Sequence, residues 1–186
     1  MEKTLVLIKP DGVERALIGK VIGKFEDTGL KISALKMITP TQELASEHYA
    51  DDSAWMEKLG KKTIASYEAK GISVKEAPIE IGRRIRKFLL DYLTQGPIVA
   101  MVVEGNDAIA IVLKLVGATS SSRADASSIR GMYSSDSYDL ADEKKRAVKN
   151  VVHASDSKET AEREIKVWFK NSEIAKYKRA DEGAMY

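Results

Sequence analysis

Apolar and polar positions along the chain follow two spacings, one typical of strands and one typical of helices. Short runs rich in β-branched and apolar residues predict strands at residues 4–8, 31–38 and 98–103. A shorter run, Val151–Val152, predicts a fourth strand just before His153. The segments between these runs carry apolar residues three and four positions apart, which predicts helices.

The predicted helices have recognisable ends. Proline and glycine predict a turn at residues 9–12 and a loop at 71–78, and Gly29 and Gly117 are plausible helix ends. Asn106 is a candidate cap for the helix that follows it. The helices are expected at residues 17–25, from 41, in two pieces between 55 and 70, at 81–92, 107–116, near 141–148 and at 157–169.

The order of these elements predicts an α/β sandwich of the ferredoxin-like type, with a four-stranded antiparallel sheet covered by helices. The connections after the first and third strands are long enough for helical crossovers. About four strands are too few for a doubly wound sheet. We expect one domain over residues 1–186, including a long polar segment at 118–149 and a charged tail after Lys170.

Composition narrows the class of protein. The 30 basic and 28 acidic residues nearly cancel, which gives no broad electrostatic case for binding nucleic acid or an anionic membrane. Cysteine is absent, so disulfides, thiolate metal sites and a cysteine nucleophile are excluded. Because the chain enters its first strand without a leader and has no membrane-spanning apolar run, we expect a cytoplasmic protein with no membrane partner.

The stretch at residues 150–157 places His153 between a β-branched run and a helix start. Asp156 can cap that helix, with Glu159 completing a capping box. Glu164 lies within the helix's apolar stripe, where a carboxylate needs a compensating partner, and His153 is the obvious candidate. A structural histidine at a strand end is the alternative interpretation.

Several common sites are missing from the sequence. There is no phosphate-binding loop of the Gly-x-x-x-x-Gly-Lys type and no dinucleotide fingerprint, so a nucleotide site would have to be built from side chains. His48 and His153 are too far apart in the sequence to suggest a metal site. A Ser-His-Asp hydrolase is possible by composition, but no Gly-x-Ser-x-Gly motif is present.

A set of motifs in a fixed order resembles the nucleoside diphosphate kinase family. The resemblance extends from the first strand to Trp168–Phe169, apart from two insertions near residues 55–81 and 133–147. The motifs are Lys9-Pro-Asp-Gly12, Glu47-His-Tyr49, Gly96-Pro-Ile-Val-Ala-Met101, Glu104-Gly105, Ile129-Arg-Gly131 and Asn150-Val-Val-His-Ala-Ser-Asp-Ser157.

The resemblance implies a ping-pong transfer of the γ-phosphate of an NTP to an NDP, through a phosphohistidine at His153. Covalent catalysis allows one site to serve two nucleotides in succession. Glu164 would bond the second ring nitrogen, Ser155 would lie on the side of that acid, and Tyr49 would lie close to the histidine. Lys9 would lie near the transferred group.

The same resemblance implies the nucleotide-binding residues and partners. Lys9 and Asn150 would hold the sugar hydroxyls, while Thr119 and Arg130 would reach the phosphates. Mg²⁺ would arrive on the nucleotide phosphates, so no protein metal ligands are expected. The implied partners are ATP and other nucleoside di- and triphosphates, together with further copies of the chain in a homo-oligomer.

Departures from the family pattern keep a second function open. Leu113 stands where the family usually has a second phosphate-binding arginine, and Lys114 or Arg123 could replace it. This motivates the alternative of a nucleotide-binding regulatory or interaction module with weak or no kinase activity. A third option is nucleic-acid binding through residues 144–146, but a short basic run on a nearly neutral chain is usually a solvated face, so we expect no nucleic-acid partner.

Overall fold

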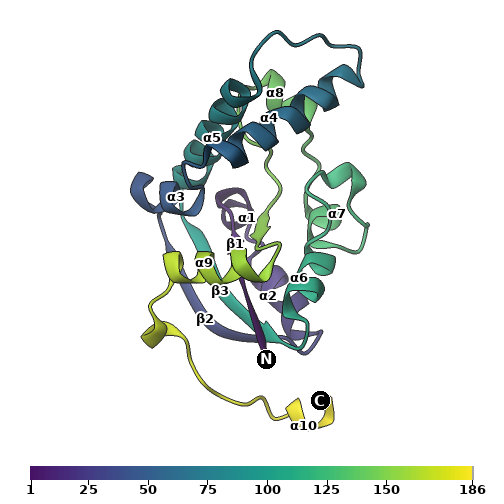
Figure 1. Cartoon of the computed structure of the whole chain (residues 1–186). Coiled ribbons are helices and arrows are strands. Elements are labelled where there is room, and N and C mark those ends of the chain that lie inside the picture. Colours follow the sequence, from purple (N-terminus) through teal and green to yellow (C-terminus); the bar gives the residue numbers. More distant parts are fainter. Residues whose placement is uncertain (186) are drawn as a thin grey trace.

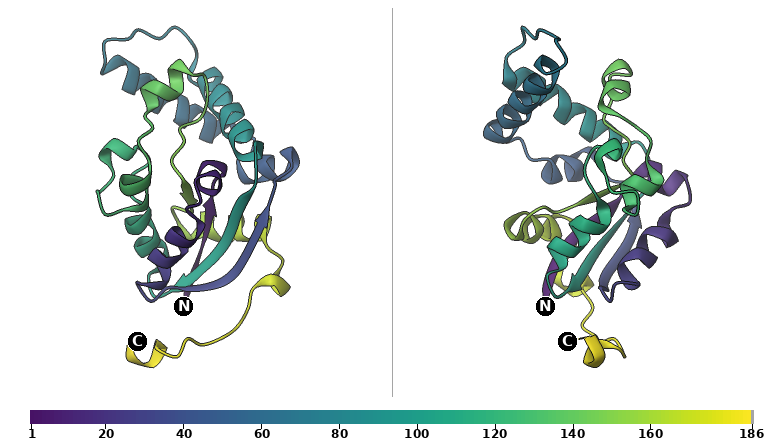
Figure 2. Two further views of the ribbon diagram at one scale, coloured as in Figure 1. Left: turned by 180° about the vertical axis from the view of Figure 1, so that it is seen from behind. Right: turned by 90° about the vertical axis from the view of Figure 1, so that its right-hand side faces the viewer.

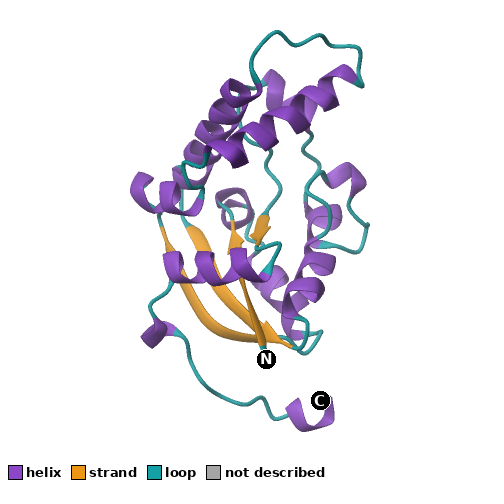
Figure 3. Cartoon of the chain, viewed as in Figure 1, coloured by secondary structure: helices purple, strands orange, loops and turns teal. Residues whose placement is uncertain are grey.

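A computed structural model describes residues 1–185, and Tyr186, the last residue of the charged tail, lies outside the described residues. Its centre is an antiparallel sheet in the order β2-β3-β1-β4 (Figures 1 and 3). The predicted fold class, an α/β sandwich with four antiparallel strands covered by helices, is confirmed. The strands are β1 (Glu2–Ile8), β2 (Lys31–Ile38), β3 (Ile98–Gly105) and β4 (Val152–Ala154).

Alternation along β1 builds a core on each face of the sheet. Leu5 and Leu7 enter one cluster with α3, α5 and α9, whereas Val6 and Ile8 enter the other with α2, α6 and α7 (Figure 2). All four side chains are fully buried. The helices are α1 (Pro10–Glu14), α2 (Ile18–Glu26), α3 (Gln42–His48), α4 (Ser53–Glu68), α5 (Pro78–Thr94), α6 (Ala108–Val116), α7 (Ile129–Tyr133), α8 (Tyr138–Glu143), α9 (Lys158–Trp168) and α10 (Glu182–Met185), with 3₁₀ turns η1 (Ser121–Arg123) and η2 (Asn171–Glu173).

Two predicted helix caps are wrong. Asn106 does not cap α6, whose start is instead bonded by a side chain from β1: the Ile109 amide donates to Glu2 Oε2 at 2.8 Å. The cap of α9 is Ser157, whose Oγ accepts from the Thr160 amide at 3.1 Å. With the cap one residue later than Asp156, Glu159 occupies the second helical position and cannot complete a capping box.

Other element boundaries also differ. The two helices expected between residues 55 and 70 are the single helix α4, and the helix expected near 141–148 lies earlier, as α8. The turn expected at 9–12 becomes α1, with Pro10 at its first position, where the missing N–H costs nothing.

Glycine explains how closely α4 and α5 approach each other. A Cβ on Gly60 would lie 1.8 Å from the Pro78 carbonyl oxygen, and one on Gly82 would lie 2.1 Å from that of Met56. The two helices therefore pack backbone to backbone at these positions, and only glycine fits.

The two segments interpreted as insertions contact each other. Tyr67 of α4 donates a hydrogen bond to Asp142 of α8 at 2.7 Å, and Lys70 pairs with Asp139. We call residues 53–77 together with 134–147 the arch; α4 and α8 lie together at the top of Figure 1, beyond the end of the sheet.

The charged tail follows the free edge of β2. The Ala175 amide donates to the Ser33 carbonyl at 2.7 Å, and Arg179 donates to the Leu30 carbonyl at 2.9 Å. No helix within residues 1–185 combines the length and apolar character needed to cross a membrane.

Candidate active site

His153 lies on β4, opposite Leu7 of β1, and its side chain is 20% exposed. Its Nε2 lies 2.8 Å from Glu164 Oε2, and Ser155 Oγ donates to the same oxygen at 2.6 Å. Burial alone raises the pKa of Glu164, but its interactions with His153, His48 and Ser155 outweigh burial and lower the pKa to about 2. An ionised carboxylate only accepts, so Nε2 carries a proton, and in the neutral imidazole the lone pair is on Nδ1.

A second imidazole lies against the first. The ring centroids of His48 and His153 are 4.6 Å apart, and Trp168 Nε1 donates to His48 Nδ1 at 3.2 Å. Burial, together with His153, lowers the pKa of His48 to about 3, so this ring is neutral. The fold brings α3 and β4 together, so the two histidines are neighbours in space although they are far apart in the sequence.

His48, His153 and Glu164 are also the only group within residues 1–185 with the spacing of metal ligands. His153 Nε2 is bonded to Glu164 Oε2, which also accepts from Ser155, and His48 Nδ1 accepts from Trp168, whereas the buried His48 Nε2 has no hydrogen-bond partner within residues 1–185. Mg²⁺ prefers oxygen ligands, and a set with two imidazoles does not suit it.

Lys9 and Asn150 form the second part of the site. Lys9 Nζ donates to Asn150 Oδ1 at 2.7 Å, and Asn150 Nδ2 donates to the Thr119 carbonyl at 2.9 Å. Burial and the charge of Arg130 lower the pKa of Lys9 to about 7, against the opposing effect of Asp11. A bound anion would favour the charged form of this amine.

Arg130, on α7, reaches the chain next to the histidine. Its two terminal nitrogens donate to the carbonyls of Gly117 at 2.8 Å and Val152 at 2.9 Å. Its buried Nε has no hydrogen-bond partner within residues 1–185. Burial lowers the pKa of Arg130 to about 10, so it remains a cation, and its guanidinium carries more N–H donors than the two carbonyls use.

Tyr49 follows α3, and the centroid of its ring lies 6.4 Å from that of His153. Burial and the charge of Glu164 raise its pKa, which keeps the phenol protonated. The structure thus brings together every predicted site residue, as three linked groups around the histidine: His153 with Glu164, Ser155 and Tyr49, Lys9 with Asn150 and Thr119, and Arg130.

Sequence reasoning missed a buried group that holds the chain two residues before His153. Tyr92 of α5 donates to one oxygen of Asp11, and the other oxygen accepts from the Val151 amide at 3.1 Å. Val151 has a φ of 68°, a strained conformation for a β-branched residue. Asp11 lies within a recognised motif, but nothing in the sequence indicated its partners.

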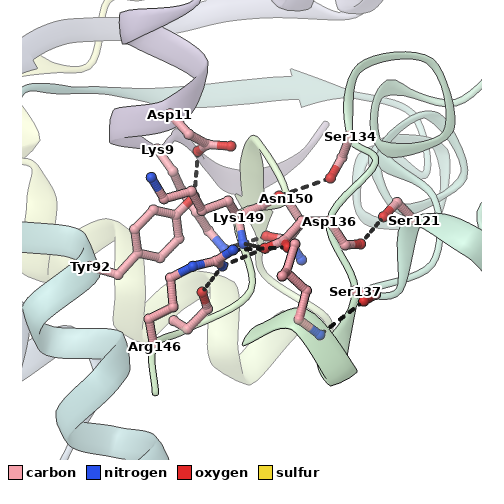
Figure 4. Close-up of polar contacts among 12 residues, drawn as sticks. Lys9, Asp11, Tyr92, Ser121, Ser134, Asp136, Ser137, Arg146, Lys149 and Asn150 are labelled. Atoms are coloured by element: carbon pink, nitrogen blue, oxygen red, sulfur yellow. Dashed lines mark hydrogen bonds and ion pairs between the residues drawn. The ribbon is translucent and has the colours of Figure 1, made fainter. Parts of the chain in front are cut away.

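A second missed network lies at the base of the arch (Figure 4). Arg146 binds both carboxylate oxygens of Asp136, at 2.6 and 3.0 Å, and the Lys149 amide donates to the same carboxylate at 2.7 Å. Ser134 Oγ donates to the Lys149 carbonyl at 2.8 Å. These bonds fix the residue that directly precedes Asn150.

Comparison with known proteins gives the family. A family model described as nucleoside diphosphate kinase matches residues 2–64 and 81–174. The chain belongs to the nucleoside diphosphate kinase family. A nucleoside diphosphate kinase of Pyrobaculum aerophilum is 47% identical over 94% of this chain and 98% of its own length, and one of Archaeoglobus fulgidus is 41% identical over 100% and 98%.

Solved structures agree with this assignment. The crystal structure of an NDP kinase from Pyrobaculum aerophilum has a TM-score of 0.90 at 45% identity, covering 94% of this chain and 99% of that one. A nucleoside diphosphate kinase from Borrelia burgdorferi, a transition-state mimic with bound vanadate and ADP, has a TM-score of 0.81 at 36% identity, covering 98% and 95%. The predicted kinase function is confirmed in preference to a regulatory module with little activity.

Proposed function

We propose that His153 carries the phosphoryl group between the two nucleotides. Nδ1 attacks the γ-phosphorus of an NTP, the bond from that phosphorus to the β-phosphate oxygen breaks, and an NDP leaves. A β-phosphate oxygen of a second NDP then attacks the phosphohistidine, the P–N bond breaks and the ring returns to its starting state. Each displacement forms one bond to phosphorus and breaks one, and no water is consumed.

One observation carries this proposal: the 2.8 Å contact between His153 Nε2 and an ionised Glu164. It leaves Nδ1 as the nitrogen with the lone pair and stabilises the positive charge that develops on the ring during attack. Ser155, fully buried, holds the same carboxylate oxygen and so fixes the orientation of the acid.

The remaining residues supply position and positive charge, which phosphoryl transfer chiefly requires. We assign Arg130 and Thr119 to the phosphates and Asn150 to the sugar hydroxyls. Lys9 contacts both the sugar and the transferred group. Tyr49, which is neutral, limits the space beside the ring.

We assign ATP and other nucleoside di- and triphosphates as substrates, with Mg²⁺ delivered on the phosphates rather than held by protein ligands. The ADP and vanadate bound by the Borrelia burgdorferi relative support this class of substrate.

Three further assignments concern the whole chain rather than the reaction. We propose a single domain over residues 1–186 with insertions near 55–81 and 133–147, a cytoplasmic location, and a homo-oligomer. Exposed apolar side chains on β2, Leu35 and Met37, support self-association. Light scattering in solution tests the last point, because a strictly monomeric mass would contradict it.

The two half-reactions test the mechanism. The chain is incubated with MgATP, freed of nucleotide and then given a different NDP. We expect an acid-labile phosphoprotein in the first step and the corresponding NTP in the second, with both lost in His153→Ala. Labelling that persists in His153→Ala would contradict the assignment of the histidine.

A further inference from the structure

One arginine differs from all the others in the described chain. Eight of the nine arginines have a hydrogen-bond or ion-pair partner within residues 1–185. Arg123, at the end of η1, has none and is exposed. A guanidinium presents a rigid fork of donors that suits phosphate oxygens. Within residues 1–185, Arg123 is therefore a cation whose donors are free to bind a ligand.

The turn that carries Arg123 is tied to the arch. Ser121 Oγ donates to the Asp136 carbonyl at 2.5 Å, and the carboxylate of Asp136 is held by Arg146 and the Lys149 amide (Figure 4). Arg123 lies two residues after Ser121, and Tyr138 lies two residues after Asp136. One hydrogen bond thus fixes the start of α8 against η1.

The same turn borders the site already described. Thr119, whose carbonyl accepts from Asn150, lies two residues before Ser121, and Gly117, whose carbonyl accepts from Arg130, lies two residues before Thr119. The segment from Gly117 to Arg123 therefore runs from the phosphate-binding arginine to the base of the arch.

Tyr138 is the first residue of α8, and its side chain stays accessible, with the residue 47% exposed. Burial raises its pKa, and the charges of Arg130 and Arg123 oppose that rise. The phenol is thus within electrostatic reach of both guanidinium groups. A phenol O–H can donate to an anion that a neighbouring guanidinium also binds.

We propose that Arg123 of η1 and Tyr138 of α8 form a phosphate-binding arm that contacts the α- and β-phosphates, which the nucleotide keeps when its γ-phosphoryl group is transferred. This inference rests on the proposed function and adds two phosphate-binding residues to it. Arg130 of α7 and the arm from η1 and α8 hold the phosphates together.

Lys114 is the competing cation, and its surroundings differ. It lies exposed on α6, and its charge acts on Asp125, whose carboxylate also accepts from the Ser127 amide at 2.8 Å. Lys114 therefore serves as the matched control, a nearby exposed cation whose charge acts on a carboxylate of the protein.

Binding of MgADP, measured by titration calorimetry, tests the arm without requiring transfer. We expect Arg123→Ala to weaken binding by about tenfold or more, because a charge-assisted hydrogen bond to phosphate is lost. Lys114→Ala should change binding less than about twofold, in keeping with an exposed cation that makes little net contribution. Arg123→Lys should recover part of the loss, since it restores the charge but not the fork. Equal binding by Arg123→Ala and Lys114→Ala would overturn the proposal.

Tyr138 is tested with two variants that separate its hydroxyl from its ring. If the hydroxyl donates to phosphate, Tyr138→Phe should weaken MgADP binding by about threefold to tenfold, nearly as much as Tyr138→Ala. Wild-type binding by Tyr138→Phe with weak binding by Tyr138→Ala would overturn the phosphate assignment in favour of ring stacking. A wild-type chain that binds MgADP but gains no phosphate from ATP would contradict the proposed function alone, because the binding comparison would still stand.

Discussion

The two ends of the proposed nucleotide site are built in different ways. Around His153 and Glu164, charged and polar groups are buried and bonded to one another, with Glu164 only 3% exposed. In the arch, contacts such as that of Lys70 with Asp139 lie in solvent, with side chains 40% and 75% exposed. Buried networks are expensive to disturb, whereas exposed ion pairs contribute about 0–1 kcal/mol. We infer that the buried end performs the chemistry and the arch adjusts binding.

The largest effect is expected for Glu164→Gln. A carboxamide can donate to His153 Nε2, which moves the ring proton to Nδ1 and removes the nucleophilic lone pair. The rate of phosphohistidine formation should fall by about 10³ to 10⁴, as for a lost orienting carboxylate in a catalytic triad. Rapid-quench measurement at saturating ATP checks this. Glu162→Gln, an exposed position on the same helix, should retain the wild-type rate. Similar rates in the two variants would contradict a special role for the buried carboxylate.

Protonation of Lys9 should make nucleotide binding depend on pH. Its pKa of about 7 means that the free protein loses this charge as pH rises through 7. Phosphate favours the charged amine, so binding above this pKa requires uptake of a proton and weakens by up to about tenfold per pH unit. Calorimetry of MgADP binding at pH 8.5 in two buffers measures the uptake. Lys9→Arg, which stays charged, should show none; wild-type binding without uptake would argue against the assigned pKa.

Much of the fold could be predicted because it follows from local pattern. The strand at 31–38 matches β2 at both ends, and the apolar spacing around Val21 gave α2. The caps of α6 and α9 could not be predicted in the same way. Glu2 bonds the start of α6 from another strand, and two neighbouring residues, Asp156 and Ser157, were both suitable caps for α9.

The candidate site likewise contains residues that the sequence indicated and contacts that it could not. Motifs identified His153 and Lys9, and the apolar stripe of α9 indicated that Glu164 needed a partner. The contacts of Asp11 with Tyr92 and Val151 join three distant segments, so no spacing along the chain reveals them.

Packing of the arch against α5 should affect the stability of the fold but not the rate of phosphoryl transfer. Gly82→Ala forces a Cβ against the Met56 carbonyl and should lower the free energy of unfolding by about 1–3 kcal/mol. Gly23→Ala, in a helix with open space at that position, should instead raise it by up to about 1 kcal/mol. Urea denaturation gives both values. At saturating ATP the phosphorylation rate of Gly82→Ala should match the wild type, and a stabilised Gly82→Ala would contradict the close helix contact.

The smallest effect on stability is expected for the contact between α4 and α8 within the arch. Burial and the hydrogen bond to Asp142 raise the pKa of Tyr67 to about 12. Tyr67→Phe removes that bond and should lower the free energy of unfolding by less than about 1 kcal/mol. Thermal unfolding of the two proteins checks this. A loss above about 2 kcal/mol would place this contact among the strong, buried interactions and erase the difference between the two regions.

The central claim is that Glu164 holds Nε2 of His153 and leaves Nδ1 to attack. Phosphorylation of a chain carrying ¹⁵N-labelled histidine, followed by NMR of the phosphoenzyme, identifies the bonded nitrogen through its coupling to phosphorus. The account predicts coupling at Nδ1 of His153 and none at Nε2. Phosphorus bonded to Nε2, or to His48, would contradict it.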